Sequence, residues 1–356
     1  MPKPLPSEDL AHILTHTRDI FASLDGSRIL ITGGTGFFGH WLLESLLHAN
    51  RELSLNIRAT VLTRNAEAFN LKAPHIAHNP AITLLEGDIR TFAFPSEPHT
   101  HILHAATDST VRTTETDLAG SILAGTQRIL AFASHSQLAT RNSQLDRKPL
   151  RLLYISSGAV YGRNITGIPG IGEDFPLPPT PASPTNYDEA KRGAETLCLQ
   201  APVDSVIARC FAFVGPHLPL DQHFAIGNFI RDALAGNPIH IKGDGTPLRS
   251  YLYMSDLAIW VWTMLATAPP NRAYNVGSDE SVSIARLANL VKENVILSAA
   301  KDPLLAPGVQ IDGTPNPNTP PPTYVPDITR AQTELNLRVT IPLAEAIRRT
   351  AAWHSQ

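Results

Sequence analysis

A glycine cluster that directly follows a short apolar run constrains the fold of this chain more than any other feature. Residues 28–32 (RILIT) form the run, and residues 33–39 (GGTGFFG) form the cluster. The spacing G-x-G-x-x-G is met by Gly34, Gly36 and Gly39, and the spacing G-x-x-G-x-x-G by Gly33, Gly36 and Gly39. Between a strand and a helix, such glycines allow a tight turn and let a pyrophosphate approach backbone N–H groups. We therefore predict a dinucleotide-binding loop at this position.

Strand-like and helix-like segments alternate from this loop to about residue 212. The predicted strands are residues 28–32, 58–63, 82–86, 101–104, 151–156 and 206–210, and the predicted helices are residues 37–48, 117–135 and 187–200. Such alternation favours a parallel sheet covered by helices on both faces. The predicted fold class is α/β, with a Rossmann-like doubly wound parallel sheet.

The two ends of the chain differ from this pattern. Apolar residues recur with helical spacing over residues 10–24, which predicts an amphipathic helix in an N-terminal extension. After about residue 212, short helices alternate with short strands. The proline-rich residues 175–184 and 314–326 are predicted to be extended loops.

Composition argues against several classes of partner and site. The net charge is −3 and no basic block occurs, so the chain lacks the positive face that nucleic acid requires. No run approaches the ~20 apolar residues of a membrane span, and the N-terminus lacks the pattern of a signal peptide. Two cysteines in 356 residues do not make a disulfide framework. We expect a cytoplasmic protein without nucleic-acid or membrane partners.

Tyr187 and Lys191 are the strongest candidates for catalysis. Residues four apart share one face of a helix, so the two side chains can interact. A free phenol has a pKa of about 10 and is a poor base at neutral pH. A nearby ammonium favours the phenolate and lowers that pKa. The pair could therefore remove a proton from a hydroxyl group while a hydride leaves the carbon that bears it.

The residues that follow the second and third strands bear on the choice of cofactor. A dinucleotide-binding fold often has an acidic residue at the end of its second strand, where it holds the ribose hydroxyls. This chain has Thr63 and Arg64 there. Arg64 could accept a 2′-phosphate, so NADP is slightly favoured over NAD. Asp88, after the third strand, could contact the adenine amino group.

Several ordered motifs support a family resemblance. After the glycine loop come residues 156–162 (SSGAVYG), 187–191 (YDEAK), 243–251 (GDGTPLRSY) and 274–277 (YNVG). With these motifs the chain resembles the extended short-chain dehydrogenase/reductases. More narrowly, it resembles the NAD-dependent epimerase/dehydratase family, which acts on nucleotide-diphosphate sugars. The match runs from about residue 28 to the C-terminus.

The resemblance implies a domain organisation and a set of partners. The implied regions are a helical extension (1–27), a dinucleotide-binding Rossmann domain (28–211) and a smaller C-terminal α/β domain that binds the nucleotide sugar (mostly 212–356). The implied partners are NAD or NADP and a nucleotide-diphosphate sugar. Family members often form homodimers through the two helices that here contain Asp117 and Tyr187, so a homodimer is also expected.

The resemblance also assigns roles to individual residues. Ser157 would hydrogen-bond the oxygen at sugar C4, Tyr187 would be the base, and Lys191 would hold the nicotinamide ribose and lower the tyrosine pKa. Asn228 and Arg249 match positions that hold the diphosphate, a role that suits the several donors of arginine. The residues assigned to the cofactor are Gly33, Gly36, Phe37, Phe38, Gly39, Arg64, Asp88, Ile89, Ala105, Ala106 and Lys191.

Departures from the family pattern narrow the reaction. Sugar 4,6-dehydratases carry an Asp-Glu pair directly after the catalytic residue, and UDP-glucuronate decarboxylases commonly carry a glutamate at the second of these positions. Here the positions hold Gly158 and Ala159, which cannot transfer protons. The family also often has asparagine at the positions of Ile122 and Ala212. The favoured activity is therefore a 4-epimerase or a 4-ketoreductase, which act only at C4.

Three alternatives stay open. The chain could be a 4,6-dehydratase or a UDP-glucuronate decarboxylase with relocated acid–base groups, or a catalytically silent dinucleotide-binding sensor.

Three histidines, His99, His101 and His104, raise the question of a metal site. A metal site needs ligands that converge on one point, and the uneven spacing of these histidines favours ordinary positions in a strand and its loop instead. We expect no metal.

Overall fold

The computed structural model describes residues 3–107, 114–141, 149–181, 183, 185–222, 224–299 and 308–355. The chain divides into two compact units. Unit 1 comprises residues 1–162, 176–210 and 258–274, and unit 2 comprises residues 163–175, 211–257 and 275–356. Two segments therefore lie on the other side of the boundary predicted at residue 211. Residues 163–175 belong with unit 2, and residues 258–274 belong with unit 1 because their strand completes its sheet.

Unit 1 contains the elements that the alternating pattern predicts, together with several that it does not. In chain order they are α1 (Ser7–Ser23), β1 (Arg28–Thr32), α2 (Phe37–Leu53), β2 (Arg58–Thr63), α3 (Ala66–Lys72), α4 (Pro74–Ala77), β3 (Ile82–Glu86), β4 (His101–His104), α5 (Glu115–Arg141), β5 (Arg151–Ser157), a 3-10 turn (Gly158–Tyr161), α6 (Tyr187–Gln200) and β6 (Asp204–Cys210). The boundary between the units falls within helix α8 (Met254–Thr267), after Leu257, and within strand β11 (Arg272–Val276), after Tyr274.

The strands of unit 1 form one seven-stranded parallel sheet in the order β11-β6-β5-β4-β1-β2-β3. The order reverses at β1, whose neighbours are β2 on one side and β4 on the other. In such sheets ligands bind at the carboxyl ends of the strands beside this reversal. The predicted Rossmann-like fold is confirmed.

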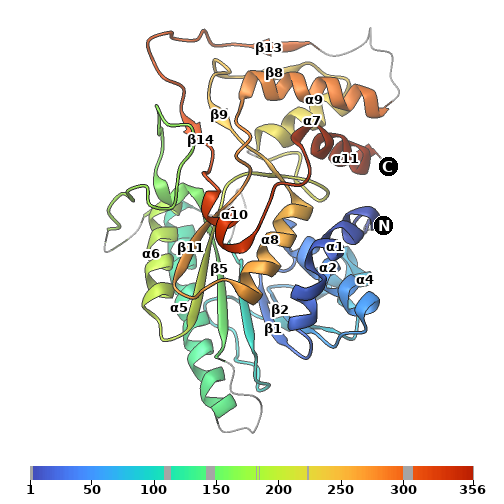
Figure 1. The fold of residues 1–356 in the computed structure, drawn as a ribbon, viewed down its shortest axis with the longest axis vertical. Helices are drawn as coiled ribbons and strands as arrows, with labels where there is room; N and C mark the ends of the chain where they lie inside the picture. The colour runs from blue at the N-terminus through green and yellow to red at the C-terminus, as the bar shows by residue number, and fades with distance from the viewer. Residues whose placement is uncertain are drawn as a thin grey trace. The chain divides into compact units, whose positions relative to one another are not determined.

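Helices cover both faces of this sheet (Figure 1). Leu30 and Tyr154 of the sheet share a buried apolar cluster with Ile129 of α5 and Ala194 of α6. On the other face, α1 packs against α2. Successive residues of a strand point to opposite faces, so strands buried on both sides are apolar throughout.

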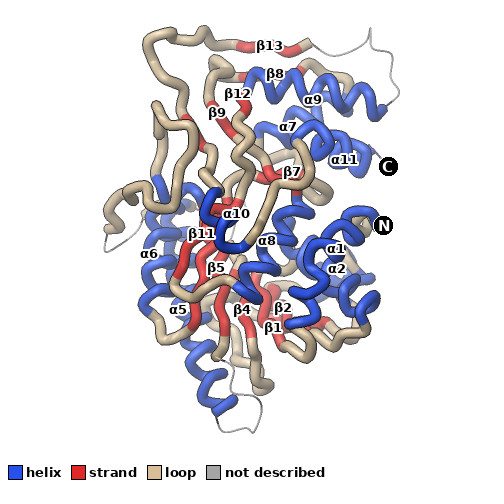
Figure 2. The backbone as a smooth tube through the Cα atoms, viewed as in Figure 1, coloured by secondary structure: helices blue, strands red, loops and turns tan. Residues whose placement is uncertain are grey.

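Unit 2 is built from short strands and helices (Figure 2). Its further elements are β7 (Phe213–Val214), α7 (Ala225–Ala235), β8 (Ile239–Ile241), β9 (Leu248–Arg249), β10 (Leu252–Tyr253), β12 (Val282–Ser283), α9 (Ile284–Ala299), β13 (Val309–Ile311), β14 (Thr323–Tyr324), α10 (Thr329–Leu335) and α11 (Leu343–Ser355). Helices α7, α9 and α11 pack against one another. The strands form the sets β12-β9-β14, β13-β8 and β10-β7.

The buried Asn275 ties together the segments that make up unit 2. Its side-chain amide donates to the carbonyls of Ile171 at 2.7 Å and Asp327 at 3.0 Å, and its backbone N–H donates to Glu173 at 2.8 Å. This explains why the segment that contains Ile171 belongs with unit 2.

The two proline-rich stretches differ from each other. Described residues 176–181 have no regular secondary structure, whereas Ala182 and Pro184 lie outside the described residues. The second stretch contains β14. Among the described residues, no helix has the length and apolar character that a membrane span requires.

Candidate active site

The glycine loop joins β1 to α2 at the carboxyl edge of the sheet. Gly33 has a φ of 75°, and a Cβ there would lie 2.6 Å from the carbonyl oxygen of Ala105. A Cβ at Gly39 would lie 2.0 Å from the carbonyl oxygen of Gly34. Glycine is therefore required at Gly33 by backbone conformation and at Gly39 by the close packing of helix on loop.

The start of α2 fits a pyrophosphate. Gly36 is the exposed N-cap residue, and no side chain caps the helix. The nearest atom to a Cβ at Gly36 would be the Gly33 carbonyl oxygen, 3.4 Å away, so the space in front of the helix is largely open. The first N–H groups of a helix have no partner within the helix and carry partial positive charge. Phe37 and Phe38 supply two of these groups and are half-buried.

The ends of β1 and β4 meet beside this loop. The hydroxyl oxygen of Thr32 accepts the backbone N–H groups of Ala105 at 3.1 Å and Ala106 at 3.0 Å. It also lies 2.8 Å from Nδ1 of His104, which is fully buried. Burial lowers the pKa of His104 to about 3, so its ring is neutral. The structure thus brings Gly33, Ala105 and Ala106 together at the strand reversal.

The residues assigned to the adenosine end lie after β2 and β3. Arg64 is exposed directly after β2. Both carboxylate oxygens of Asp88 accept hydrogen bonds from the Arg90 guanidinium, at 2.7 and 2.8 Å. These hydrogen bonds lower the pKa of Asp88 to about 2. Ile89 packs closely against α5, since a Cβ at Gly125 would lie 2.8 Å from its side chain.

The three residues assigned to catalysis come together in unit 1. Ser157 is the last residue of β5, and Tyr187 is the first residue of α6. Asn186 caps α6 by accepting the N–H of Glu189 at 3.0 Å, which fixes the helix start beside Tyr187. The side chain of Ser157 lies close enough to the Tyr187 hydroxyl to lower its pKa. Nζ of Lys191 lies 5.7 Å from the centre of the Tyr187 ring.

The ionisation of Tyr187 differs from the expectation. Burial of the phenol raises the pKa of Tyr187 to about 12, and the hydrogen bond from Ser157 opposes this rise. Lys191 is buried and donates to the backbone carbonyl of Ile155 at 2.8 Å. Burial lowers the pKa of Lys191 to about 8, so its ammonium is still mostly charged at neutral pH. In the protein alone the net shift of the Tyr187 pKa is upward, because desolvation dominates. The lowering of that pKa by Lys191 stays a prediction.

The two residues assigned to the diphosphate lie in unit 2. Asn228, in α7, donates to the carbonyl of Gln222 at 3.0 Å and accepts from Arg231 at 3.0 Å. Arg249, in β9, donates to the carbonyl of Leu248 at 2.8 Å, and its guanidinium lies 5.8 Å from the centre of the Tyr324 ring. Both side chains are partly exposed.

The three histidines of the β4 region bond to different partners. His99 bonds the hydroxyl of Thr60 at 3.0 Å, and His101 bonds the hydroxyl of Thr100 at 2.8 Å. His104 bonds Thr32, as described above. They do not converge on one point in unit 1.

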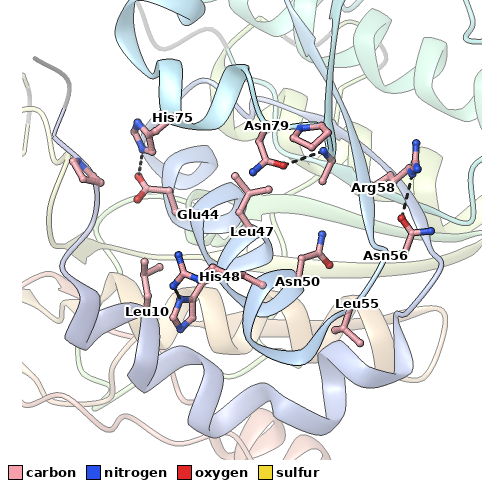
Figure 3. A pocket seen from close by; sticks show the side chains of 14 residues that line it. Leu10, Glu44, Leu47, His48, Asn50, Leu55, Asn56, Arg58, His75 and Asn79 are labelled. Atoms are coloured by element: carbon pink, nitrogen blue, oxygen red, sulfur yellow. Dashed lines mark hydrogen bonds and ion pairs between the residues drawn. The ribbon is translucent and has the colours of Figure 1, made fainter.

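A pocket of about 620 Å³ lies elsewhere in unit 1 (Figure 3). Its lining includes Leu10 of α1, Glu44 and Leu47 of α2, and Arg58, which begins β2. His75 and Glu44 point toward each other there, with 3.3 Å between Nε2 and Oε1. The pocket therefore lies at the amino edge of the sheet, opposite the glycine loop, and none of the predicted site residues lines it.

A comparison with known families bears on the glycine loop and the Ser157–Tyr187–Lys191 cluster. The family described as the NAD dependent epimerase/dehydratase family matches residues 29–277. The chain belongs to this family. The predicted resemblance and the expectation of an enzyme of the epimerase/dehydratase type are thereby confirmed.

Relatives within the family carry several activities. The UDP-glucuronic acid decarboxylase 1 of Xenopus tropicalis is 26% identical over 92% of this chain and 72% of its own length. Among solved structures, the dTDP-glucose 4,6-dehydratase DesIV of Streptomyces venezuelae, with NAD and TYD bound, is 22% identical with a TM-score of 0.71 over 92% of this chain and 96% of that one. The UDP-glucuronic acid 4-epimerase of Bacillus cereus, in complex with UDP-glucuronic acid and NAD, is 22% identical with a TM-score of 0.70 over 92% and 98%. These structural likenesses show the fold.

Sequence reasoning missed a buried polar network beside the catalytic cluster. It consists of Ser156, Tyr161, Glu195 and Arg209, all nearly inaccessible to solvent. One signal was present in the sequence, because Tyr187, Lys191 and Glu195 are spaced four apart and so share one face of α6. The strand that supplies the arginine could not be read from that spacing.

Proposed function

We propose that this protein is a nucleotide-diphosphate-sugar 4-epimerase, or a 4-ketoreductase, that works by hydride transfer at sugar C4. The observation that carries the proposal is the cluster in which Ser157 and the buried Lys191 both lie beside Tyr187. Ser157 binds the oxygen at C4, and Tyr187 takes its proton. The bound dinucleotide supplies a hydride acceptor that can return the hydride. In an epimerase, the ketone intermediate rotates in the site so that its other face receives the hydride, and Tyr187 then returns the proton.

The residues after Ser157 support a reaction confined to C4. Gly158 and Ala159 begin the 3-10 turn that Ser157 caps, with its hydroxyl oxygen accepting the N–H of Ala159 at 3.1 Å. Neither side chain can protonate a leaving hydroxyl at C6 or remove a proton from C5. Elimination of water would need such groups from elsewhere in the chain.

UDP-glucuronate decarboxylation is the second candidate, because relatives named UDP-glucuronic acid decarboxylase match about nine-tenths of this chain. Oxidation at C4 of a uronate makes a β-keto acid, which can lose CO₂ and then take up a proton. This route needs the same Ser157–Tyr187 pair for the first step. Return of the hydride to the C4 ketone would then give a nucleotide pentose, the product that distinguishes this route from epimerisation.

A panel of UDP-, dTDP-, GDP- and CDP-sugars, including UDP-glucuronate, tests both candidates, with products read by NMR. We expect a C4 epimer or C4 alcohol, whereas a nucleotide pentose and CO₂ would favour the decarboxylase. The Tyr187→Phe variant should lose turnover and still bind the dinucleotide. Cofactor binding by the unmutated protein without conversion of any nucleotide sugar would indicate a silent sensor.

The cofactor proposal is NADP, with Arg64 as the group that binds a 2′-phosphate. Arg64 is exposed at the end of β2, and no acidic residue follows the strand directly to compete for the ribose hydroxyls. Release of the cofactor by denaturation, followed by mass measurement, identifies it. Recovery of NAD alone would contradict the role of Arg64. An epimerase is expected to retain its cofactor, and stoichiometric consumption of added NADPH would favour the ketoreductase.

A further inference from the structure

A buried ion pair joins α6 to β6. The guanidinium of Arg209 donates to the carboxylate of Glu195 through Nη2 at 2.8 Å and through Nε at 3.1 Å. The side chains of Arg209 and Glu195 are only 7% and 4% exposed. Two charges out of water need further partners, because the attraction between them barely offsets their lost hydration.

Two hydroxyl groups supply those partners. Ser156 donates to Oε1 of Glu195 at 2.5 Å. Arg209 donates through Nη1 to the hydroxyl oxygen of Tyr161 at 3.0 Å, and its guanidinium lies 5.0 Å from the centre of that ring. The four residues form one connected network, which we call the Glu195–Arg209 network.

Three members of this network are adjacent to parts of the catalytic cluster. Ser156 directly precedes Ser157 on β5. Tyr161 ends the 3-10 turn that begins directly after Ser157. Glu195 lies one turn beyond Lys191 and two turns beyond Tyr187 on the same face of α6. The network therefore joins the element that carries Ser157 to the helix that carries Tyr187 and Lys191.

We propose that Glu195 is a positioning residue, which through Ser156 and Arg209 fixes α6 against β5 and so holds the hydroxyl of Tyr187 against that of Ser157. The inference rests on the proposed function, since it concerns the same proton transfer. A buried ion pair adds little stability over apolar residues of similar volume. We therefore assign the ion pair a role in the placement of the Tyr187 and Ser157 hydroxyls. Misplacement of a reacting group by about 1 Å can cost roughly 10²-fold in rate.

The test uses two changes that leave the Glu195–Arg209 ion pair in place, at Ser156 and Tyr161, and one that breaks it, at Glu195. Ser156→Ala removes the hydroxyl that binds Glu195, and Ser156→Thr keeps a hydroxyl at that position. Tyr161→Phe removes the hydroxyl oxygen that accepts a hydrogen bond from Arg209. We expect Ser156→Ala and Tyr161→Phe to lower kcat by about tenfold, with little change in KM or in dinucleotide binding, and Ser156→Thr to retain more activity than Ser156→Ala. Glu195→Gln should have a larger effect, and its folding is checked by circular dichroism.

Two readouts separate positioning from a merely structural role. The Ser157 hydrogen bond lowers the pKa of Tyr187, so its loosening in Ser156→Ala should shift the acidic limb of the kcat profile to higher pH. In a Ser157→Ala background, Ser156→Ala should have little further effect, because the pair it positions is gone. Lowered melting temperatures with unchanged kcat and pH profile would overturn the proposal.

Failure of this inference is distinguishable from failure of the proposed function. If Tyr187→Phe is inactive while Ser156→Ala and Tyr161→Phe retain full kcat, the proposed function stands and the positioning role falls. If Tyr187→Phe keeps its turnover, or if no nucleotide sugar is converted, both fall.

Discussion

At the scale of single residues, the candidate site depends on how a tyrosine becomes a base. Burial raises the pKa of Tyr187 to about 12, while Ser157 lowers it through a hydrogen bond. Lys191 lies close enough to interact with the phenol, but its own pKa falls to about 8 and its Nζ bonds a backbone carbonyl. Ser157 is therefore the side chain that most directly favours the phenolate in the protein alone.

This balance predicts the behaviour of Ser157→Ala. The tyrosine acts as a base only when deprotonated, so loss of the hydrogen bond raises its pKa and moves the acidic limb of the kcat profile to higher pH. We expect kcat at neutral pH to fall by about 10²-fold. Measurement of kcat from pH 6 to pH 10 tests this, within the range where the fold survives by circular dichroism. Ser157→Thr is the control, and an identical profile for Ser157→Ala would contradict the assignment.

At the scale of elements, the turn into α2 contains one glycine that matters for binding and one that matters for folding. A Cβ fits at Gly36 without displacing any backbone atom, whereas at Gly39 it would collide with Gly34. The backbone at Gly36 has a φ of −91°, which any residue adopts. The two glycines of one motif thus serve different purposes.

Gly36→Ala is expected to weaken dinucleotide binding by at least about tenfold with little change in melting temperature, because its methyl group occupies the approach of the pyrophosphate. Gly39→Ala is expected to lower the melting temperature, because the start of α2 must move. Calorimetric titration with NAD and NADP, together with thermal unfolding, measures both effects. Equal loss of stability in the two variants would contradict this division.

The elements also show what the sequence could predict. The helix predicted at residues 187–200 coincides with α6, and the strand predicted at 151–156 corresponds to β5, because their apolar periodicity is local. Strand β11 was missed because five residues carry little pattern, and its place beside β6 is set by the tertiary fold. The partner of Glu195 was missed for a similar reason. Helical spacing identifies a face, and only the fold shows which strand lies against it.

At the scale of the whole molecule, we propose a homodimer through α5 and α6. Gly120 lies on the exposed face of α5, and a Cβ there meets no atom within 4 Å. Gly120→Glu should therefore leave the monomer folded and place a carboxylate in the dimer interface, where burial without a partner is costly. We expect sedimentation equilibrium to show a dimer for the unmutated protein and a monomer for this variant. Ala11→Glu on α1 is the control, and a monomeric unmutated protein would contradict the proposal.

Strand β11 closes one edge of the main sheet, although its residues lie far along the chain from β6. During synthesis, six strands have left the ribosome long before residues 272–276 are made. Until then, the backbone N–H and C=O groups on the outer edge of β6 have no strand partner, and an open edge invites pairing with other chains. A nascent chain of this protein is therefore expected to need protection by chaperones, and a fragment that stops at residue 211 is expected to aggregate.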